Sequence, residues 1–531
     1  MNLRTTSIRV ALTFVLGMAA VPYACYPVKT VSSQLPTMVQ TTDVPTKIYL
    51  KDGTVHVFQQ GFSVRRVPPD TIFGKSTRYT AGEGAGVTEL AAISTGDIAT
   101  LHTYDRRYTA GRAVANFITA SYTAFILPTS IYCLTCPKCC FGSCPTVYID
   151  SDTTHSIQAE LFSHAISPLL EDDDVDLLPA PIGHGGGFTL TMTNEALESH
   201  FVNAFNVSMI SVPKGRTLFP VSGRRFCSID SLHRPLEAKN SVGTDVLSLI
   251  DAVDDEAYRS PDDMVRTLSR EHRKDWVEVS IPANRLGSQF LVCRYKNTLM
   301  STILLYDIVL GSQGVRAIDW TQRLSTDRSY AALFSSVYAS FSGMTVERLN
   351  KGNWEHVARI PDAGPLAWKT VAVPVVAGSE PEVRLRLTHV PDNIMIDAIA
   401  WGNGEMLHAS AELPLTPVKA IDGMGRDRSD ILPMVREMDD DYLENEPGDS
   451  YELSYVAAVP KDKVGRIIIR SKGYYYEWIR GGWLERNSKD VAFDLLEIDR
   501  TLKELSRRWL ADKEEVERVF FQTRVPLRRM P

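Results

Sequence analysis

The sequence predicts a mainly β fold made of several small β-rich domains, followed by one C-terminal amphipathic helix. Short segments in which apolar and polar residues alternate recur along most of the chain, as in Gly187–Thr193 and Asp275–Pro282. This alternation is typical of strands that bury one face. Only the last segment, about residues 490–521, repeats apolar residues at spacings of three and four, which predicts a helix.

Length and composition indicate a globular protein with several cores. The chain has 531 residues, of which 44% are hydrophobic and 23% are charged. These are ordinary values for folded domains. The net charge is −7 and no long run of Lys and Arg interrupts the chain, so we expect no nucleic-acid partner.

Residues 1–24 have the features of a signal peptide. Arg4 and Arg9 are followed by Val10–Val21, an uncharged apolar run that is short for a membrane span. Ala24-Cys25 resembles a bacterial lipobox, although Pro22 stands where such boxes favour an aliphatic residue. Lipidation of Cys25 and ordinary cleavage next to it both remain open, and both predict export. A lipid on Cys25 would make the membrane the first partner of the chain.

Shifts in composition divide the rest of the chain. Residues 45–107 predict a small barrel or sheet, with strands on either side of an Asp52-Gly53 turn. Residues 110–140 hold an apolar segment and a cysteine cluster. Within them, residues 113–137 carry no charged side chain. A transmembrane helix and a buried or interfacial hairpin are both compatible with this stretch. Residues 141–243 predict a β module that contains an acidic loop at 171–176, and residues 244–275 have a composition compatible with helices. Residues 265–405 predict a β-sandwich, in which we expect 301–310 to be a strand. An acidic linker at 422–450 and a strand pair followed by a helix at 451–531 complete the chain. We find no internal repeat of fixed period.

Four short motifs carry a family resemblance. They are Phe141-Gly-Ser-Cys-Pro-Thr-Val-Tyr148, Ala159-Glu-Leu-Phe-Ser-His-Ala-Ile166, Thr193-Asn-Glu-Ala-Leu-Glu-Ser-His-Phe-Val-Asn203 and the late Tyr474-Tyr-Tyr-Glu-Trp478. The chain resembles uncharacterised bacterial envelope proteins or lipoproteins with an SCP-type stretch and an NEALE(T/S)H-type stretch. The resemblance implies a signal sequence, a small β domain, an apolar segment, the SCP module and a sandwich-like region. It implies no activity.

The cysteines form the most conspicuous candidate site. The spacing within the cluster fits neither an iron–sulfur run nor paired zinc ligands. In an exported chain disulfides are the simplest interpretation, with metal ligands and free thiols as alternatives. The candidates for disulfides are Cys133, Cys136, Cys139, Cys140, Cys144, Cys227 and Cys293. Glu195, Glu198 and His200 have no spacing of a known metal site, so we predict no metal and no cofactor.

Aromatic residues provide a second candidate. Trp354, Trp368 and Trp401 in the predicted sandwich fit either a platform on which sugar rings stack or ordinary core and edge positions. The aromatic group at 474–483 fits either a partner-binding patch or cross-strand pairs.

The functional hypothesis is a non-enzymatic, membrane-anchored envelope protein that acts as a scaffold or binding component, with another envelope protein as a partner. No coherent set of catalytic residues stands out in the sequence. The alternative is a carbohydrate-binding or carbohydrate-processing surface protein that uses residues 275–401. A redox protein that uses the cysteine cluster is a third hypothesis.

Overall fold

The computed structural model confirms a mostly β architecture with several separate sheets and a C-terminal helix. It describes residues 41–42, 46–50, 54–58, 62–65, 70–79, 87–103, 144–152, 154, 156–183, 186–196, 198–221, 225–284, 287–313, 316–376, 380–439, 441–477 and 497–522. The predicted signal segment with Cys25, the apolar segment 113–137 and the cysteines at 133, 136, 139 and 140 lie outside the described residues. The chain divides into two compact units.

The N-terminal unit is a seven-stranded sheet in the order β1-β4-β5-β3-β2-β7, with β6 on β5. Its elements are β1 (Thr41–Thr42), β2 (Thr46–Leu50), β3 (Val55–Phe58), β4 (Phe62–Arg65), β5 (Thr71–Tyr79), β6 (Val87–Ser94), η1 (Thr95–Asp97) and β7 (Ile98–Thr103). Alternate residues of these strands, among them Ile48, Phe58, Phe62 and Ile72, form a small apolar core. The predicted pairing of 46–50 with 55–58 is confirmed.

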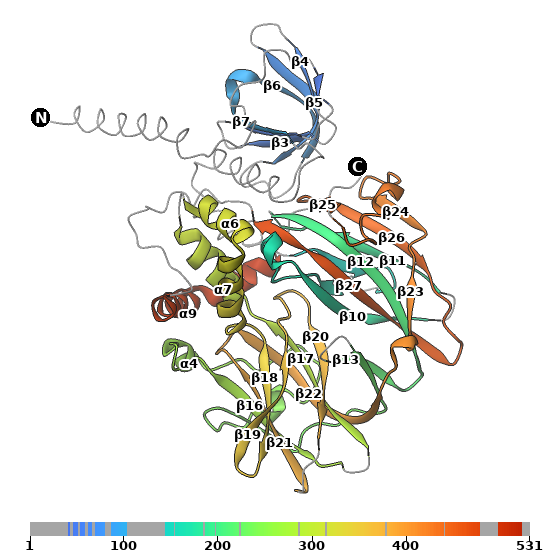
Figure 1. Ribbon diagram of the computed structural model, residues 1–531, viewed down its shortest axis with the longest axis vertical. Helices are drawn as coiled ribbons and strands as arrows, with labels where there is room; N and C mark the ends of the chain where they lie inside the picture. The colour runs from blue at the N-terminus through green and yellow to red at the C-terminus, as the bar shows by residue number, and fades with distance from the viewer. Residues whose placement is uncertain are drawn as a thin grey trace, which may run out of the picture. The chain divides into compact units, whose positions relative to one another are not determined.

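The second unit contains two β-sandwiches (Figure 1). The first has one sheet in the order β24-β26-β11-β8-β9 and another in the order β10-β27-β12-β23, with β25 on β12. Its strands are β8 (Thr146–Ile149), β9 (Ala159–Glu160), β10 (Asp172–Ile182), β11 (Gly187–Thr193), β12 (Glu198–Pro213), β23 (Glu412–Leu415), β24 (Lys419–Asp422), β25 (Leu443–Asn445), β26 (Ser450–Val456) and β27 (Lys463–Glu477). Three successive residues of β27, Ile467, Ile468 and Ile469, are fully buried, so this strand is covered on both faces.

The second sandwich packs a sheet in the order β15-β16-β21-β18-β19 against strands of a closed five-stranded barrel, β13-β14-β22-β17-β20. Its strands are β13 (Thr217–Val221), β14 (Arg225–Ile229), β15 (Glu237–Asn240), β16 (Asp275–Pro282), β17 (Ser288–Asn297), β18 (Met344–Asn350), β19 (Asn353–Ile360), β20 (Lys369–Val375), β21 (Glu382–His389) and β22 (Ile394–Met406). Val277 and Leu385 of the sheet share one core with Leu291 and Ile396 of the barrel strands. A second core, which includes Phe219 and Phe290, fills the barrel.

The same strand arrangement occurs twice along the second unit, although we find no corresponding repeat of fixed period in the sequence. β11 pairs with β8 just as β21 pairs with β18. β24 pairs with β26 just as β15 pairs with β16. The turn after each of these edge strands is also the same, because Asn240 Oδ1 and Asp422 Oδ1 both accept backbone N–H groups two and four residues ahead. Gly243 and Gly425 hold equivalent positive φ angles of 83° and 73° in these turns.

Each sandwich takes strands from both copies of this arrangement. The first copy runs from β8 to β17 and the second from β18 to β27. β10 and β12 of the first copy pair with β27 of the second, whereas β20 and β22 of the second copy pair with β17 of the first. A β-bulge falls at Asn203 in β12 and at Asp397 in β22. Both bulged residues accept a backbone N–H, from Asp439 and Asp255 respectively. The second sandwich is nevertheless one continuous segment, β13 to β22, inserted between β12 and β23 of the first.

The predicted strand at 301–310 is wrong, because this segment is helical. α5 (Met300–Thr302) continues into the π-helical segment η5 (Ile303–Leu310), and nearly every side chain of the segment is buried. A uniformly apolar run lacks the periodicity that distinguishes a buried strand from a buried helix. The other helices are η3 (Pro168–Leu170), η4 (Leu247–Leu249), α4 (Asp262–Arg266), α6 (Ala317–Thr326), α7 (Arg328–Ala339), η7 (Ala409–Ala411), η8 (Ser429–Ile431) and α9 (Ile498–Gln522).

The C-terminal half of the chain completes sheets that begin far upstream. The acidic stretch at 422–450 contributes η8 and β25, and β25 pairs with β12. The strand pair that follows it joins two different sheets, since β26 pairs with β11 and β27 with β10 and β12. The predicted C-terminal helix is confirmed as α9, whose apolar side, with Leu502, Leu505 and Trp509, is buried.

Candidate ligand-binding face

The four family motifs meet in a buried polar cluster of the first sandwich. Cys144 precedes β8, Glu160 lies in β9, Glu198 and His200 begin β12, and Tyr475 lies in β27. His200 Nε2 is 2.6 Å from Glu198 Oε1, and both side chains are fully buried. The Tyr475 hydroxyl donates to the Ser163 carbonyl at 3.0 Å and is hydrogen-bonded to Cys144 and to the Tyr306 hydroxyl. Sequence reasoning singled out these motifs without predicting that they meet.

The chemistry of this cluster favours a structural role. Burial, together with the carboxylates of Glu160 and Glu198, raises the pKa of the Cys144 thiol, which therefore stays protonated and is a poor nucleophile. Glu160 Oε2 accepts the backbone N–H of Leu366 at 2.8 Å and so ties β9 to the segment that leads into β20. Within the described residues, no group of three His, Cys, Asp or Glu side chains is placed to hold a metal ion.

The acidic segment at 171–176 is not the solvated loop that composition predicts. It enters β10, and its carboxylates surround the ammonium group of Lys369, which is 2.9 Å from Asp174 and 3.0 Å from Asp176. Burial, with the neighbouring Asp174 carboxylate, raises the pKa of Asp176 to about 7. The segment is therefore part of an ion-paired connection to β20 of the second sandwich.

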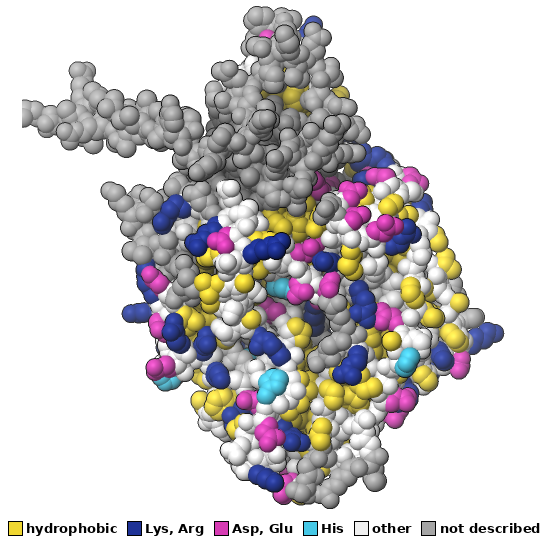
Figure 2. All heavy atoms as spheres, in the orientation of Figure 1, with side chains coloured by type: hydrophobic (Ala, Val, Ile, Leu, Met, Phe, Trp, Pro, Cys, Tyr) yellow, Lys and Arg dark blue, Asp and Glu magenta, His cyan; other side chains and the backbone are white. Residues whose placement is uncertain are grey.

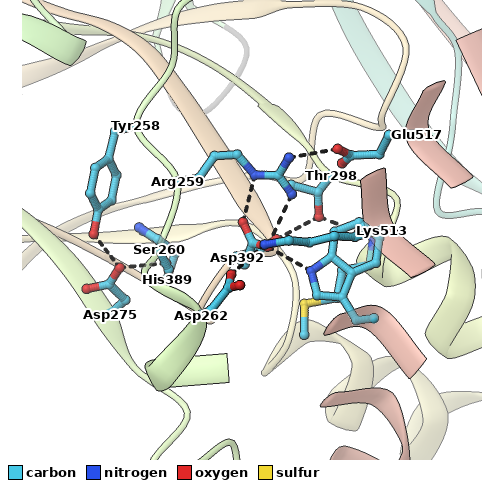
Figure 3. A network of polar contacts seen from close by, with 12 residues as sticks. Tyr258, Arg259, Ser260, Asp262, Asp275, Thr298, His389, Asp392, Lys513 and Glu517 are labelled. Atoms are coloured by element: carbon cyan, nitrogen blue, oxygen red, sulfur yellow. Dashed lines mark hydrogen bonds and ion pairs between the residues drawn. The ribbon is translucent and has the colours of Figure 1, made fainter. Parts of the chain in front are cut away.

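A second buried carboxylate holds α9 against the second sandwich (Figure 3). Asp392 is fully buried in a left-handed backbone conformation with φ 56°. It accepts hydrogen bonds from Arg259 Nε at 2.8 Å and from Trp509 Nε1 at 2.7 Å, and Lys513 Nζ lies 3.5 Å away. Glu517 of α9 binds the same guanidinium of Arg259 at 2.7 Å. This network is an anchor for the helix.

The structure does not bring the three predicted stacking tryptophans together. Trp354 lies in β19, Trp368 precedes β20 and Trp401 lies in β22. Each contacts a different polar group: Arg386 lies 3.9 Å from the Trp354 ring, Arg294 and Lys296 each lie 4.5 Å from Trp368, and Trp401 Nε1 donates to the Arg234 carbonyl at 3.1 Å. We therefore find no common platform made of all three.

A different aromatic pair is present on the outer face of the second sandwich. We use this name for the side chains of β16, β21, β18 and β19 that point away from the shared core. Trp276 joins Trp354 there, and the Arg386 guanidinium lies over both rings, 4.4 Å from Trp276 and 3.9 Å from Trp354. The sequence analysis missed Trp276, although the alternation in Asp275–Pro282 places its side chain on the face of the strand that the buried Val277 does not occupy.

A polar pocket of about 120 Å³ adjoins the outer face. The strand registers place Trp276 opposite Thr388, Thr388 opposite Thr345, and Thr345 opposite Arg359, and the last three residues line the pocket. Arg273 and Lys274 add two more positive charges, and Glu347 is the only carboxylate among the described residues that line it. The pocket is therefore cationic.

The described cysteines are free and buried rather than disulfide-bonded. Cys144, Cys227 and Cys293 are separate thiols. Cys227 in β14 and Cys293 in β17 belong to different cores, and β22 lies between their strands. Strands two places apart in a sheet are roughly 9–10 Å apart, which exceeds the span of a disulfide. Burial raises the pKa of Cys227 to about 12.

The aromatic residues at 474–476 are also buried. Tyr474 stacks on Phe201 of the neighbouring strand with ring centroids 4.8 Å apart. These three tyrosines therefore form cross-strand contacts rather than a surface patch. Among the residues that the structure describes, no helix is both long enough and apolar enough to cross a membrane.

Comparisons with known proteins assign no family. No family model matches the chain, and no curated protein matches it. Among solved structures, an allantoicase has 10% identity over 51% of this chain and 92% of its own, with a TM-score of 0.18. An α-xylosidase from Xanthomonas citri has 8% identity over 82% and 37%, with a TM-score of 0.15. An exo-β-1,3-galactanase from Phanerochaete chrysosporium has 7% identity over 69% and 84%, with a TM-score of 0.16. Scores this low carry no implication for this chain.

Proposed function

We propose that this chain is a non-enzymatic binding or scaffold component of the bacterial envelope, and that it binds its partner through the outer face of the second sandwich. The observation that carries the proposal is the Trp276–Arg386–Trp354 stack beside a cationic pocket. Aromatic and arginine side chains are the groups that contribute most to binding surfaces. Side chains held on a sheet also lose little conformational freedom when they bind.

The buried motif cluster supports a role without catalysis. Its thiol is held protonated, and burial raises the pKa values of Tyr306 and Tyr475, so both phenols stay neutral. Glu160 and Glu198 act on groups inside the same core. Side chains in this position stabilise the first sandwich and the connection to the second.

The envelope location rests on residues 1–25. If Cys25 is lipidated, the wild-type chain fractionates with membranes and incorporates a labelled fatty acid, whereas Cys25→Ser does neither. Secretion of both forms without label would instead indicate ordinary cleavage of the signal segment, and export would stand without the anchor.

The binding role is tested by chemical crosslinking of the tagged chain in its native cells, followed by mass spectrometry. We expect one envelope protein to recur at near-equal yield in wild type and to be depleted when Trp276 and Trp354 are replaced by alanine. The matched control is Trp401→Ala, since this residue lies in β22, which belongs to a different sheet. A recurring partner that is equally abundant in all variants would contradict binding through the outer face.

Carbohydrate binding by residues 275–401 is a second candidate. The observation that favours it is the position of Trp276 and Trp354 on the outer face, where both side chains are half-buried, because indole rings on a sheet surface suit sugar stacking. A glycan array with the full chain tests it. Reproducible glycan binding that is lost in Trp354→Ala and retained in Trp401→Ala supports this candidate, and an array without signal removes it.

A further inference from the structure

We propose that the cationic pocket beside the outer face binds the acid group of an acidic saccharide, such as a uronic acid. This inference rests on the second candidate function, carbohydrate binding, and names a ligand class for the same face. Two features of the pocket carry it: its surplus of positive charge and its continuity with the aromatic pair.

The positive charges come from three side chains on different elements. Arg359 of β19 donates to the carbonyls of Ala339 and Ser342, which fix its guanidinium at the pocket wall. Arg273 Nη1 donates to Ser340 Oγ at 3.0 Å. Lys274 is exposed, and no ion pair of its side chain is found within the described part of the chain. Two guanidinium groups held by hydrogen bonds and one exposed ammonium suit a carboxylate, sulfate or phosphate.

The nearby carboxylates leave this charge in place. Glu347 lines the pocket, and its Oε2 accepts the Thr388 hydroxyl at 2.9 Å. Asp275 follows Lys274 in the chain, but its side chain is buried on the other side of the strand. There it accepts hydrogen bonds from Tyr258 and Ser260, both at 2.6 Å (Figure 3). Three cations thus oppose one carboxylate in the lining.

The size and position of the pocket fit one end of a sugar ring. Its volume of about 120 Å³ is several times the roughly 30 Å³ that one water occupies in the liquid. It therefore accommodates an acid group and adjoining ring atoms rather than a whole oligosaccharide. Trp276 is paired with the lining residue Thr388, so the next sugar would lie beside the Trp276 and Trp354 rings. Acidic sugars carry both the anion that the cationic pocket selects and a ring that can stack on indole side chains.

The test is isothermal titration calorimetry of the purified full chain with three probes: a galacturonic acid oligomer, a neutral galactose oligomer of similar length, and sodium phosphate. We expect binding of the acidic oligomer, at least tenfold weaker binding of the neutral oligomer, and weak binding of phosphate. Lys274→Ala and Arg359→Ala should each weaken the acidic oligomer about tenfold, the effect of one lost charge-assisted hydrogen bond. Lys461→Ala, at an exposed turn after β26, is the matched control and should bind as wild type does.

Four outcomes overturn the inference. They are equal affinity for the acidic and neutral oligomers, phosphate binding as tight as that of the acidic oligomer, wild-type affinity in both pocket variants, or no binding of any probe. Unchanged circular dichroism of the variants separates these outcomes from misfolding. The proposed binding role fails separately, in the crosslinking experiment, so a silent titration with a recurring crosslinked partner removes only the saccharide inference.

Discussion

Replacing Asp392 by asparagine should detach α9 from the second sandwich at a measurable cost in stability. The carboxylate is fully buried and receives two hydrogen bonds from Arg259, at 2.8 and 3.1 Å, and one from Trp509. Asparagine keeps the shape and one acceptor oxygen, but it turns an NH₂ group toward these donors. It also tolerates the left-handed backbone at φ 56°, so the substitution isolates the charge from backbone strain.

The expected magnitude follows from the groups left behind. Each hydrogen bond to a charged group contributes about 1.5–3 kcal/mol, and removing one partner of a buried ion pair costs about 3–5 kcal/mol. We therefore expect Asp392→Asn to lower the free energy of unfolding by about 3 kcal/mol or more. Asp263→Asn is the control, because the Asp263 side chain is 96% exposed and forms an ion pair with Arg266 at 3.3 Å on the protein surface. It should change stability by less than about 0.5 kcal/mol.

Urea unfolding followed by tryptophan fluorescence is a suitable assay, because Trp509 is buried against Asp392. Limited proteolysis should also cut the C-terminal region faster in Asp392→Asn than in wild type. A loss below about 1 kcal/mol, within the range of ordinary surface substitutions and close to that of Asp263→Asn, would refute the assignment of this network as the anchor of α9.

Three further predictions concern the buried polar groups of the second unit. Because Asp176 has a pKa of about 7 in the folded chain, above the ordinary value of a carboxyl group, its contribution to stability is present at low pH and is lost as the pH rises toward 7. Urea unfolding at pH 4.5 and 7.5 should show this loss in wild type and a smaller change in Asp176→Asn. The same change of unfolding free energy with pH in both proteins would contradict the prediction. Gly364→Ala should be markedly destabilising in thermal melts, because the residue has φ 77° and an added Cβ would lie 2.5 Å from Glu160 Oε2. Gly352→Ala is the control: this residue has φ 84° but open space around it, so the variant should lower the free energy of unfolding by only about 1 kcal/mol, the cost of the backbone conformation. The thiols of Cys227 and Cys293 should resist alkylation in the native chain and react fully in guanidinium without reductant, and a requirement for reductant would show that they are disulfide-bonded.

The strands were predictable because the sequence encodes them locally. The predicted segments 187–193 and 275–282 coincide with β11 and β16, since alternation alone defines a strand with one buried face. The helix at 301–310 was not predictable, because its uniformly apolar residues do not alternate with polar ones. α7 was missed although Asp327 caps it by accepting the N–H groups of Ser329 and Tyr330, a signal that the sequence does contain.

The exchange of strands between the two copies could not be predicted from local pattern. β17 and β27 pair with strands of the other copy, and only the long-range registers reveal this. The same holds for the candidate site. Lys274, Thr388 and Arg359 come from segments far apart in the sequence, and nothing in their sequence neighbourhoods indicates a pocket. Composition wrongly predicted a solvated loop at 171–176, because Lys369, which neutralises the acidic residues, lies almost two hundred residues downstream.

The most direct test of binding through the outer face is site-specific photocrosslinking in the native cells. A photoreactive phenylalanine at position 354 places the probe on the outer face, and the same residue at position 413, exposed in the first sandwich, is the control. The account predicts a recurring protein or saccharide adduct from position 354 and none from position 413. No adduct from position 354, or the same adducts from both positions, would contradict it.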